Sequence, residues 1–253
     1  MKRLILKISL IIMVCLICVS CSTSSNHVIS DQAISYYQSG LDYAQKGQYD
    51  LAIDAYSKVI ELDPNSAAPY NNRGAVYDDK RQYDLAIADY NKAIELDPKL
   101  ASAYNNRGVS YKNKGQYDLA IADYDKAVEL DYRYAEAYCN RGLSYDCKGV
   151  YDLAIADYSK AIELNPKYDT AFYNRGLTYY KEGQNDLAIV DCNKAIQLSP
   201  NLSTAYYIRG MAYYKKGQNN WAIADLQKVV DISKDTELVN VSKRNIEIIR
   251  QLR

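Results

Sequence analysis

Large and small side chains alternate at helical spacing along much of the chain. Residues 67–100 contain two such sets. The first set is Tyr70, Gly74 and Tyr77, and the second is Ala86, Tyr90 and Ala93. Steps of four and three residues place side chains on one face of an α-helix. The pattern therefore predicts two helices that pack together, with tyrosines supplying bulk and the small residues allowing close approach.

This two-helix pattern recurs at an interval of 34 residues, which is typical of a repeat protein. The glycines that mark the copies are Gly40, Gly74, Gly108, Gly142, Gly176 and Gly210. An alanine follows each of them by twelve residues, at Ala52, Ala86, Ala120, Ala154, Ala188 and Ala222. The six copies span residues 33–66, 67–100, 101–134, 135–168, 169–202 and 203–236.

The repeated unit resembles the tetratricopeptide repeat, and the resemblance covers residues 33–236. The signature of that family falls on Tyr70, Gly74, Tyr77, Ala86, Tyr90, Ala93 and Pro98. It implies an all-α fold, a right-handed superhelical solenoid of six helix-turn-helix units. Residues 237–253 are expected to form a capping helix over the last repeat, because a solenoid needs a polar outer end. Its predicted inward residues are Leu238, Val241, Ile249 and Leu252.

Polar residues and prolines are expected to mark the ends of the second helices. The predicted N-caps are Asp50, Asp84, Asp118, Asp152, Asp186 and Asn220. The predicted stops are Pro64, Pro98, Pro166 and Pro200. Tyr132 takes the place of the proline in the third copy, where we expect a looser junction.

An arginine precedes the marker glycine in every copy but the first. In the same copies an aspartate follows this arginine by sixteen residues. The pairs are Arg73 and Asp89, Arg107 and Asp123, Arg141 and Asp157, Arg175 and Asp191, and Arg209 and Asp225. We hypothesise that each pair bridges the two helices of its repeat; inheritance through duplication is the alternative. Half-exposed, such a pair would contribute only about 0–1 kcal/mol.

The N-terminus predicts export. Residues 1–20 combine a basic start with an apolar run that is too short to span a bilayer, as in a signal peptide. The end of this run resembles a bacterial lipobox, with Cys21 as the lipidated residue and residues 21–32 as a polar tether. The family prefers leucine where Cys18 stands, so a plain cleaved signal is the alternative. We expect a protein anchored to the cell envelope through Cys21, or a secreted or periplasmic one.

Composition argues against several classes of protein. The net charge is zero, which gives no electrostatic basis for binding nucleic acid. The one histidine, His27, lies in a polar stretch, and no cluster of metal ligands, phosphate loop or catalytic triad is present. The cysteines of the repeats, Cys139, Cys147 and Cys192, form no disulfide or zinc spacing. We expect no enzyme activity, no cofactor and no metal site.

The resemblance also implies where a partner would bind. In this family the first helix of each repeat lines a concave groove that grips extended peptides, in some members through a row of asparagines. The matching row here is Asn72, Asn106, Asn140 and Asn174. A carboxamide both donates and accepts hydrogen bonds, so it can pair with a peptide backbone of any sequence. Retention through repeat duplication is the alternative.

Groove positions differ between the two halves of the chain. The N-terminal half offers Asn71, Asp78, Asp79, Asn105 and Lys112. The C-terminal half offers Tyr173, Leu177, Tyr180, Tyr207, Met211 and Tyr214. We expect the anchoring contacts in repeats five and six, unless these aromatic residues pack under the final helix instead. The carboxylate clamp of chaperone-binding members is absent, since only Asn72 matches it.

The sequence thus predicts a lipid-anchored adaptor that binds an unidentified protein or peptide in its groove. The alternative is a structural envelope protein that associates with itself.

Overall fold

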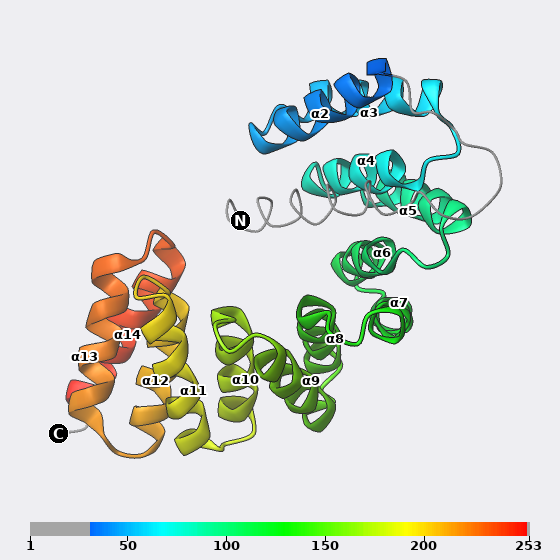
Figure 1. Ribbon diagram of the computed structural model, residues 1–253. Coiled ribbons are helices and arrows are strands. Elements are labelled where there is room, and N and C mark those ends of the chain that lie inside the picture. Colours follow the sequence, from blue (N-terminus) through cyan, green and yellow to red (C-terminus); the bar gives the residue numbers. More distant parts are fainter. Residues whose placement is uncertain (1–30, 252–253) are drawn as a thin grey trace. The chain divides into compact units, whose positions relative to one another are not determined.

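The computed structural model describes residues 31–251, and they form thirteen helices and no strand. The chain divides into two compact units at Lys114–Gly115, and each unit is described by itself. The helices of unit 1 are α2 (Asp31–Gln45), α3 (Tyr49–Leu62), α4 (Ala67–Asp79), α5 (Tyr83–Leu96) and α6 (Ala101–Asn113). The helices of unit 2 are α7 (Tyr117–Leu130), α8 (Ala135–Cys147), α9 (Tyr151–Leu164), α10 (Asp169–Lys181), α11 (Asn185–Leu198), α12 (Ser203–Lys215), α13 (Asn219–Ile232) and α14 (Thr236–Gln251). Within each unit, consecutive helices pack side by side as helix-turn-helix repeats (Figure 1). The predicted all-α repeat fold is confirmed.

The alternation of large and small residues explains how the helix pairs close. Tyr56, Tyr90 and Tyr158 are at most 1% exposed and lie against the marker glycine of their own repeat. A Cβ atom added to Gly74 would come within 2.7 Å of the Tyr90 ring, so any larger residue there would force the helices apart. In the last two repeats Cys192 and Leu226 replace the tyrosine, and both are 0% exposed. The core thus consists of small residues packed on a few large ones.

The tyrosine hydroxyls do not all find partners. Tyr90 donates a hydrogen bond to Asp78 Oδ2 at 2.9 Å. The hydroxyl of Tyr158, at the same repeat position, is buried without a hydrogen-bond partner among the described residues. The Tyr158 hydroxyl therefore lacks the hydrogen bond that Tyr90 makes to Asp78.

The arginine–aspartate hypothesis is confirmed for the four pairs that lie within one unit. Arg73 donates from Nε and Nη2 to the two carboxylate oxygens of Asp89, both at 2.8 Å. The corresponding pairs are Arg141 with Asp157, Arg175 with Asp191, and Arg209 with Asp225. The four aspartate side chains are only 5–9% exposed, so the pairs are largely buried rather than half-exposed.

The same arginines also reach the preceding repeat. Arg73 Nη1 donates to Ser57 Oγ at 2.9 Å, and Arg175 Nη1 donates to Ser159 Oγ at 2.8 Å. Each arginine therefore ties together three helices. The first repeat has Ser39 and Ala55 at the two positions and therefore has no such pair.

The predicted N-caps are wrong. The second helices begin one residue before the predicted caps, so the true N-cap positions lie two residues before them. These positions are held by Gln48, Gln82, Gln116, Val150, Gln184 and Gln218, without side-chain cap bonds. The five aspartates lie in the first turn, and four of them pair with a lysine of the next repeat. These pairs are Asp50 with Lys80, Asp84 with Lys114, Asp118 with Lys148, and Asp186 with Lys216. The aspartates thus join neighbouring repeats instead of capping helices.

The last helix, α14, packs on α13. Its buried residues are Ser242, Ile246 and Ile249, so Ile249 was predicted correctly and Ile246 was missed. Leu238 and Val241 are half-buried, and Leu252 lies outside the described residues. The second helix of the third repeat ends at Leu130, in register with the others, although Tyr132 replaces the proline. No helix in residues 31–251 has the length and apolar character needed to cross a membrane.

Candidate binding faces

The candidate residues lie on the first helix of each repeat, at positions that share one face of that helix. We call the fifth, sixth, ninth and twelfth positions of a repeat its inner positions. Unit 1 carries them on α2, α4 and α6, and unit 2 carries them on α8, α10 and α12. The residues of the asparagine row occupy the sixth position, and all four are half-buried.

In unit 1 the asparagine row is bonded to neighbouring repeats. Asn72 Nδ2 donates to the Tyr37 hydroxyl at 2.8 Å. Asn106 Nδ2 donates to Asn71 Oδ1 at 3.1 Å and its Oδ1 accepts from Asn105 Nδ2 at 3.3 Å. The amides of this row therefore serve the junctions between repeats, a role that spacing alone did not reveal.

Asp78 closes the same face of unit 1. Its carboxylate accepts hydrogen bonds from Tyr90 at 2.9 Å and from Ser110 Oγ at 2.8 Å. Burial raises the pKa of Asp78 to about 6, because the two hydroxyl donors and Lys112 compensate only in part. This face is polar, and its polar groups are largely paired with one another.

In unit 2, Asn174 is held less firmly than the asparagines of unit 1. Asn174 Nδ2 lies 3.8 Å from Cys139 Sγ, and a thiol is a weak acceptor. Asn140 has the same position on α8, where its backbone carbonyl accepts from Ser144 Oγ. The Asn174 carboxamide is therefore less engaged with its own chain than Asn72 or Asn106.

Apolar and aromatic side chains surround Asn174 on α10. Tyr173, Leu177 and Tyr180 are all half-buried. Burial raises the pKa of Tyr173, and a hydrogen bond with Thr204 opposes part of that rise. Burial also raises the pKa of Tyr180, which lies near Tyr207. This stretch of α10 combines an amide with an apolar surface.

The inner residues of the sixth repeat pack against α14. Tyr207, Met211 and Tyr214 contact the cluster formed by Leu226, Ile246 and Ile249, among others. Asn245 Nδ2 lies 3.4 Å from both the Tyr207 hydroxyl and Met211 Sδ. The expectation that aromatic residues pack under the final helix is thus confirmed for this repeat, and α10 is left as the aromatic face that α14 does not cover.

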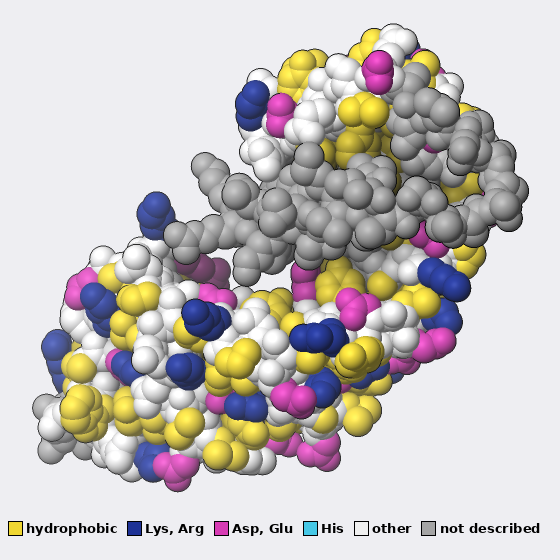
Figure 2. Space-filling view, in the orientation of Figure 1, with side chains coloured by type: hydrophobic (Ala, Val, Ile, Leu, Met, Phe, Trp, Pro, Cys, Tyr) yellow, Lys and Arg dark blue, Asp and Glu magenta, His cyan; other side chains and the backbone are white. Residues whose placement is uncertain are grey.

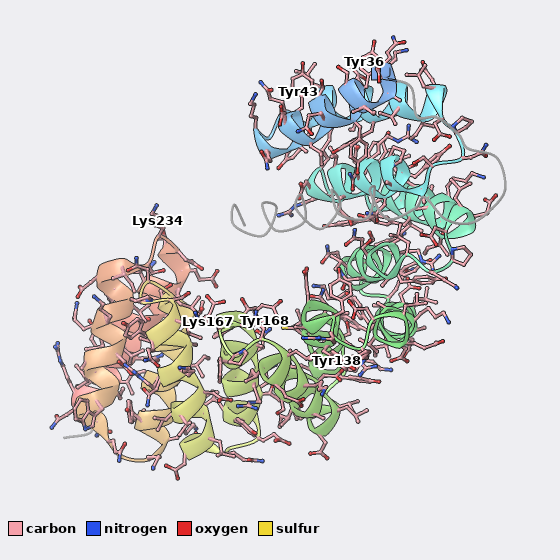
Figure 3. All side chains as sticks on the ribbon, in the orientation of Figure 1. Tyr36, Tyr43, Tyr138, Lys167, Tyr168 and Lys234 are labelled. Atoms are coloured by element: carbon pink, nitrogen blue, oxygen red, sulfur yellow. The ribbon has the colours of Figure 1, made fainter. Side chains whose placement is uncertain are left out.

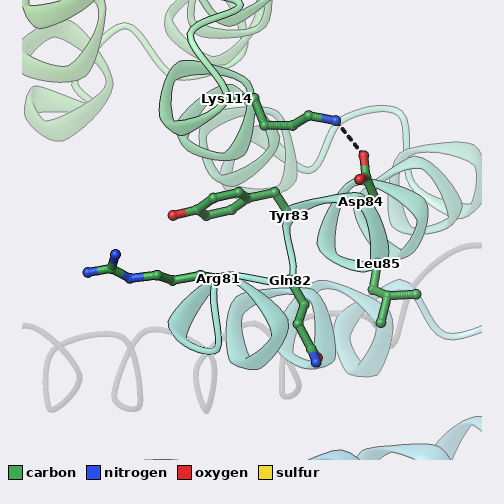
Figure 4. Close-up of a pocket in the computed structure, with 6 residues that line it drawn as sticks. All are labelled: Arg81, Gln82, Tyr83, Asp84, Leu85 and Lys114. Carbon is green, nitrogen blue, oxygen red and sulfur yellow. Dashed lines mark hydrogen bonds and ion pairs between the residues drawn. The ribbon is translucent and has the colours of Figure 1, made fainter.

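A turn in unit 1 has a feature that sequence reasoning missed. Arg81 has φ 58° at a position where the other repeats have Gly47, Gly115, Gly149, Gly183 and Gly217. Its side chain forms one wall of a surface pocket of about 310 Å³, crossed by the ion pair of Lys114 and Asp84 (Figure 4). The sequence does indicate this turn, because one copy lacks the glycine that the other five have at this position.

Figure 3 shows how densely side chains fill the space between the helices, with Tyr36 and Tyr43 on α2 and Tyr138 on α8. On the face of unit 2 in view in Figure 2, basic, acidic and apolar side chains are interspersed. Within residues 31–251, no three His, Cys, Asp or Glu side chains are grouped so that they could hold a metal ion.

Comparison with protein families identifies the repeat. Residues 40–80, 77–115 and 148–183 match a family model described as TPR repeat. Residues 101–131, 170–202 and 203–236 match models described as tetratricopeptide repeat. The chain belongs to the tetratricopeptide repeat family. Proteins of this family are generally non-enzymatic scaffolds for protein interactions, and this chain has their fold.

Several solved structures are similar. YrrB, described as a TPR protein with an unusual peptide-binding site, is 28% identical with a TM-score of 0.60, and the match covers 76% of this chain and 100% of YrrB. A MamA structure is 34% identical with a TM-score of 0.57, covering 64% of this chain and 94% of MamA. PilF of Pseudomonas aeruginosa is 20% identical with a TM-score of 0.75, covering 85% of this chain and 98% of PilF, and shows the likeness of fold alone. No curated protein matches the chain.

Proposed function

We propose that this protein is a lipid-anchored adaptor that binds an extended segment of a partner protein on the inner face of unit 2. The binding site is centred on α10, where Asn174, Leu177 and Tyr180 meet the peptide. Asn140 and Tyr173 extend the site, and Tyr207 and Tyr214 support it from beside α14. YrrB, to which this chain is similar, is described as having a peptide-binding site, which supports a peptide ligand.

The observation that carries the proposal is the difference in hydrogen bonding along the asparagine row. Asn72 and Asn106 already make bonds of 2.8 and 3.1 Å within unit 1. Asn174 makes one long contact to sulfur, so pairing with a peptide backbone would sacrifice little. A ligand that must replace strong internal hydrogen bonds gains little binding free energy from its own, since only the difference between the two sets of bonds contributes to affinity.

Magnitudes favour a mixed polar and apolar contact. A hydrogen bond contributes about 0.5–1.5 kcal/mol, and micromolar affinity needs about 8 kcal/mol. The asparagines alone are therefore too weak. Full burial of a leucine or aromatic side chain adds about 1.5–3 kcal/mol, which the exposed parts of Leu177 and Tyr180 can supply in part.

The test is photocrosslinking in the native host from position 177. Position 160 is the control, because Lys160 lies on the second helix α9, outside the inner positions. We expect a discrete crosslinked product from position 177 and none from position 160. Products from position 160 alone would overturn the proposal. A product that contains only a second copy of this chain would favour the self-associating structural protein.

The anchor is a separate part of the proposal. Cys21 and the signal region lie outside the described residues, so the proposal rests on the lipobox resemblance of residues 18–21. We expect metabolic labelling with a radioactive fatty acid to mark the full chain, and Cys21→Ser to remove both the label and membrane association. A protein that is unlabelled and released from the cell would instead indicate a plain signal peptide.

A further inference from the structure

The fifth repeat departs from the other copies at several positions that are not inner positions, and three of these changes make it less polar. Phe172 stands where the other copies have tyrosine. Val190 replaces an alanine, or Asp54 in the first copy. Gln197 replaces a glutamate, or Asp231 in the sixth. Phe172 removes a hydroxyl group, Val190 adds apolar surface and Gln197 removes a charge, and all three changes fall in one copy.

The structure brings these three residues together. They line one surface pocket of about 460 Å³ between α10 and α11, together with Arg175, Asp191, Asn193 and Lys194. Phe172 is 9% exposed and forms an apolar wall, while Val190 is 61% exposed. A valine this exposed has no packing role in its own repeat, so its apolar surface is available to a ligand.

The charge of the pocket also differs from that of the equivalent surface in the first four repeats. In the first four repeats the equivalent lysine pairs with a glutamate three residues later, as Lys160 does with Glu163 at 2.7 Å. Lys194 instead donates to the neutral Gln197 Oε1 at 3.1 Å. Arg175 is neutralised by Asp191, so Lys194 leaves one uncompensated positive charge.

A second donor lies beside this lysine. Asn193 Oδ1 accepts from Arg209 Nη1 at 2.6 Å, which fixes the orientation of the carboxamide. The Nδ2 group of Asn193 donates no hydrogen bond to another of the described residues. An ammonium group and an amide N–H beside an apolar wall match a carboxylate next to an apolar side chain.

We propose that this pocket is a second docking site, independent of the α10 inner face, for an acidic segment of a partner protein. The apolar side chain of that segment lies on Phe172 and Val190. The adjacent carboxylate accepts hydrogen bonds from Lys194 Nζ and Asn193 Nδ2. The site gives the adaptor a contact with chemistry different from that of its inner face.

The test is a titration of the full chain, with valine and leucine methyl groups labelled for NMR. The probes are the acetylated, amidated peptides Gly-Leu-Glu-Gly, Gly-Leu-Gln-Gly and Gly-Gly-Glu-Gly. We expect Gly-Leu-Glu-Gly to shift the Val190 methyl signals with a dissociation constant on the order of 1 mM, as a single side-chain contact allows. The glutamine peptide should bind about threefold more weakly, since an exposed ion pair contributes little. The peptide without leucine should leave the signals in place.

Two sets of variants keep the result specific. Gln197→Glu returns a carboxylate to Lys194 and should weaken binding about threefold, measured on the Val190 methyl signals that this variant retains. The combination Tyr70→Phe, Ala88→Val and Glu95→Gln copies the three features into the second repeat, where Asn91 already holds the position of Asn193, and should create a second responding site there. Thermal melting of each variant checks that the fold is kept.

Equal shifts with all three peptides, no shift with any of them, or an unchanged affinity in the Gln197→Glu variant would overturn the proposal. Movement of the Val190 signals on concentrating the protein alone would assign the pocket to a second copy of the chain and would also overturn it. Crosslinking from position 177 uses different residues, so each proposal can fail without the other.

Discussion

Unit 1 and unit 2 are built from the same repeat but use their inner faces differently. In unit 1 the asparagines and Asp78 bond to neighbouring repeats at 2.8–3.1 Å. In unit 2 Asn174 has a contact of 3.8 Å to sulfur, and its neighbours on α10 are apolar or aromatic. The difference in bonding follows from the fifth position of the preceding repeat, which is Tyr37 or Asn71 for the asparagines of unit 1 and Cys139 for Asn174.

This comparison shows why one side-chain type at one repeat position need not have one role. A carboxamide beside a hydroxyl or another amide is used within the protein. The same carboxamide beside a thiol and apolar groups keeps most of its bonding capacity, because sulfur competes poorly for its N–H groups. The neighbours of the asparagine row, rather than the asparagines, therefore separate a structural face from a binding face.

The largest expected effect concerns what the two units share. Arg175→Ala in unit 2 leaves Asp191, whose side chain is 5% exposed, as a buried unpaired carboxylate. Breaking such a pair costs about 3–5 kcal/mol. Arg73→Ala in unit 1 should cost a similar amount, since Asp89 is 9% exposed. Urea unfolding followed by circular dichroism measures both. A loss below about 1 kcal/mol in either variant would show that the pair is not part of a common framework.

The next effect separates the two faces by binding. Leu177→Ala and Tyr180→Ala should each lower the yield of the product crosslinked from position 173 about tenfold, corresponding to about 1.4 kcal/mol. Asn72→Ala should leave the yield unchanged, because that amide serves the junction to Tyr37. Immunoblots of the crosslinked product, normalised to protein level, give the comparison. An equal loss from Asn72→Ala would mean that unit 1 also binds the partner.

A third effect separates the two units by their core tyrosines. Tyr158→Phe removes a hydroxyl that is buried without a partner, so it should raise the free energy of unfolding by about 1 kcal/mol. Tyr90→Phe removes the donor of a 2.9 Å bond to Asp78 and should lower that free energy by about 1 kcal/mol. Urea unfolding of both variants tests the opposite signs. Destabilisation by Tyr158→Phe would indicate a water-mediated partner for its hydroxyl.

The repeat, the helix pairs and the arginine–aspartate bridges could be predicted because each rests on a spacing that recurs. The positions of Tyr90, Gly74 and Arg73 were sufficient, since helical geometry converts a spacing into a shared face. The caps failed for a related reason. Asp84 has the composition of a cap, but the helix begins one residue before it, and Lys114 of the next repeat supplies its partner.

The candidate site was less predictable because it depends on contacts between repeats. Nothing in the asparagine spacing distinguishes Asn72 from Asn174; the distinction lies in Tyr37 and Cys139, each 35 residues away. The covering of Tyr207 by α14 depends in the same way on a segment outside the repeats. Departures such as Arg81, Val190 and Gln197 are visible in the sequence, but only the structure shows that two of them share a pocket.

The smallest expected effect is a difference in pH dependence between the two units. Burial raises the pKa of Asp78 to about 6, above its usual value of 3.8. Between these two values the folded chain holds a proton that the unfolded chain has lost, so stability falls as the pH rises from 4 towards 6 and stays low above it. Asp78 is only half-buried, so we expect less than about 1 kcal/mol.

Asp78→Asn should therefore stabilise the protein slightly at pH 7.5 and flatten the dependence of its melting temperature on pH between 4 and 7. Asp146 occupies the same repeat position in unit 2, but it accepts from Thr178 and pairs with Lys181. Asp146→Asn should instead destabilise the protein, because it removes the charge that Lys181 pairs with. Thermal melts of the two variants at pH 5 and 7.5 provide the measurement. If both variants behaved alike, the carboxylate at this position would have the same role in both units, and the contrast between the two inner faces would be confined to the asparagines.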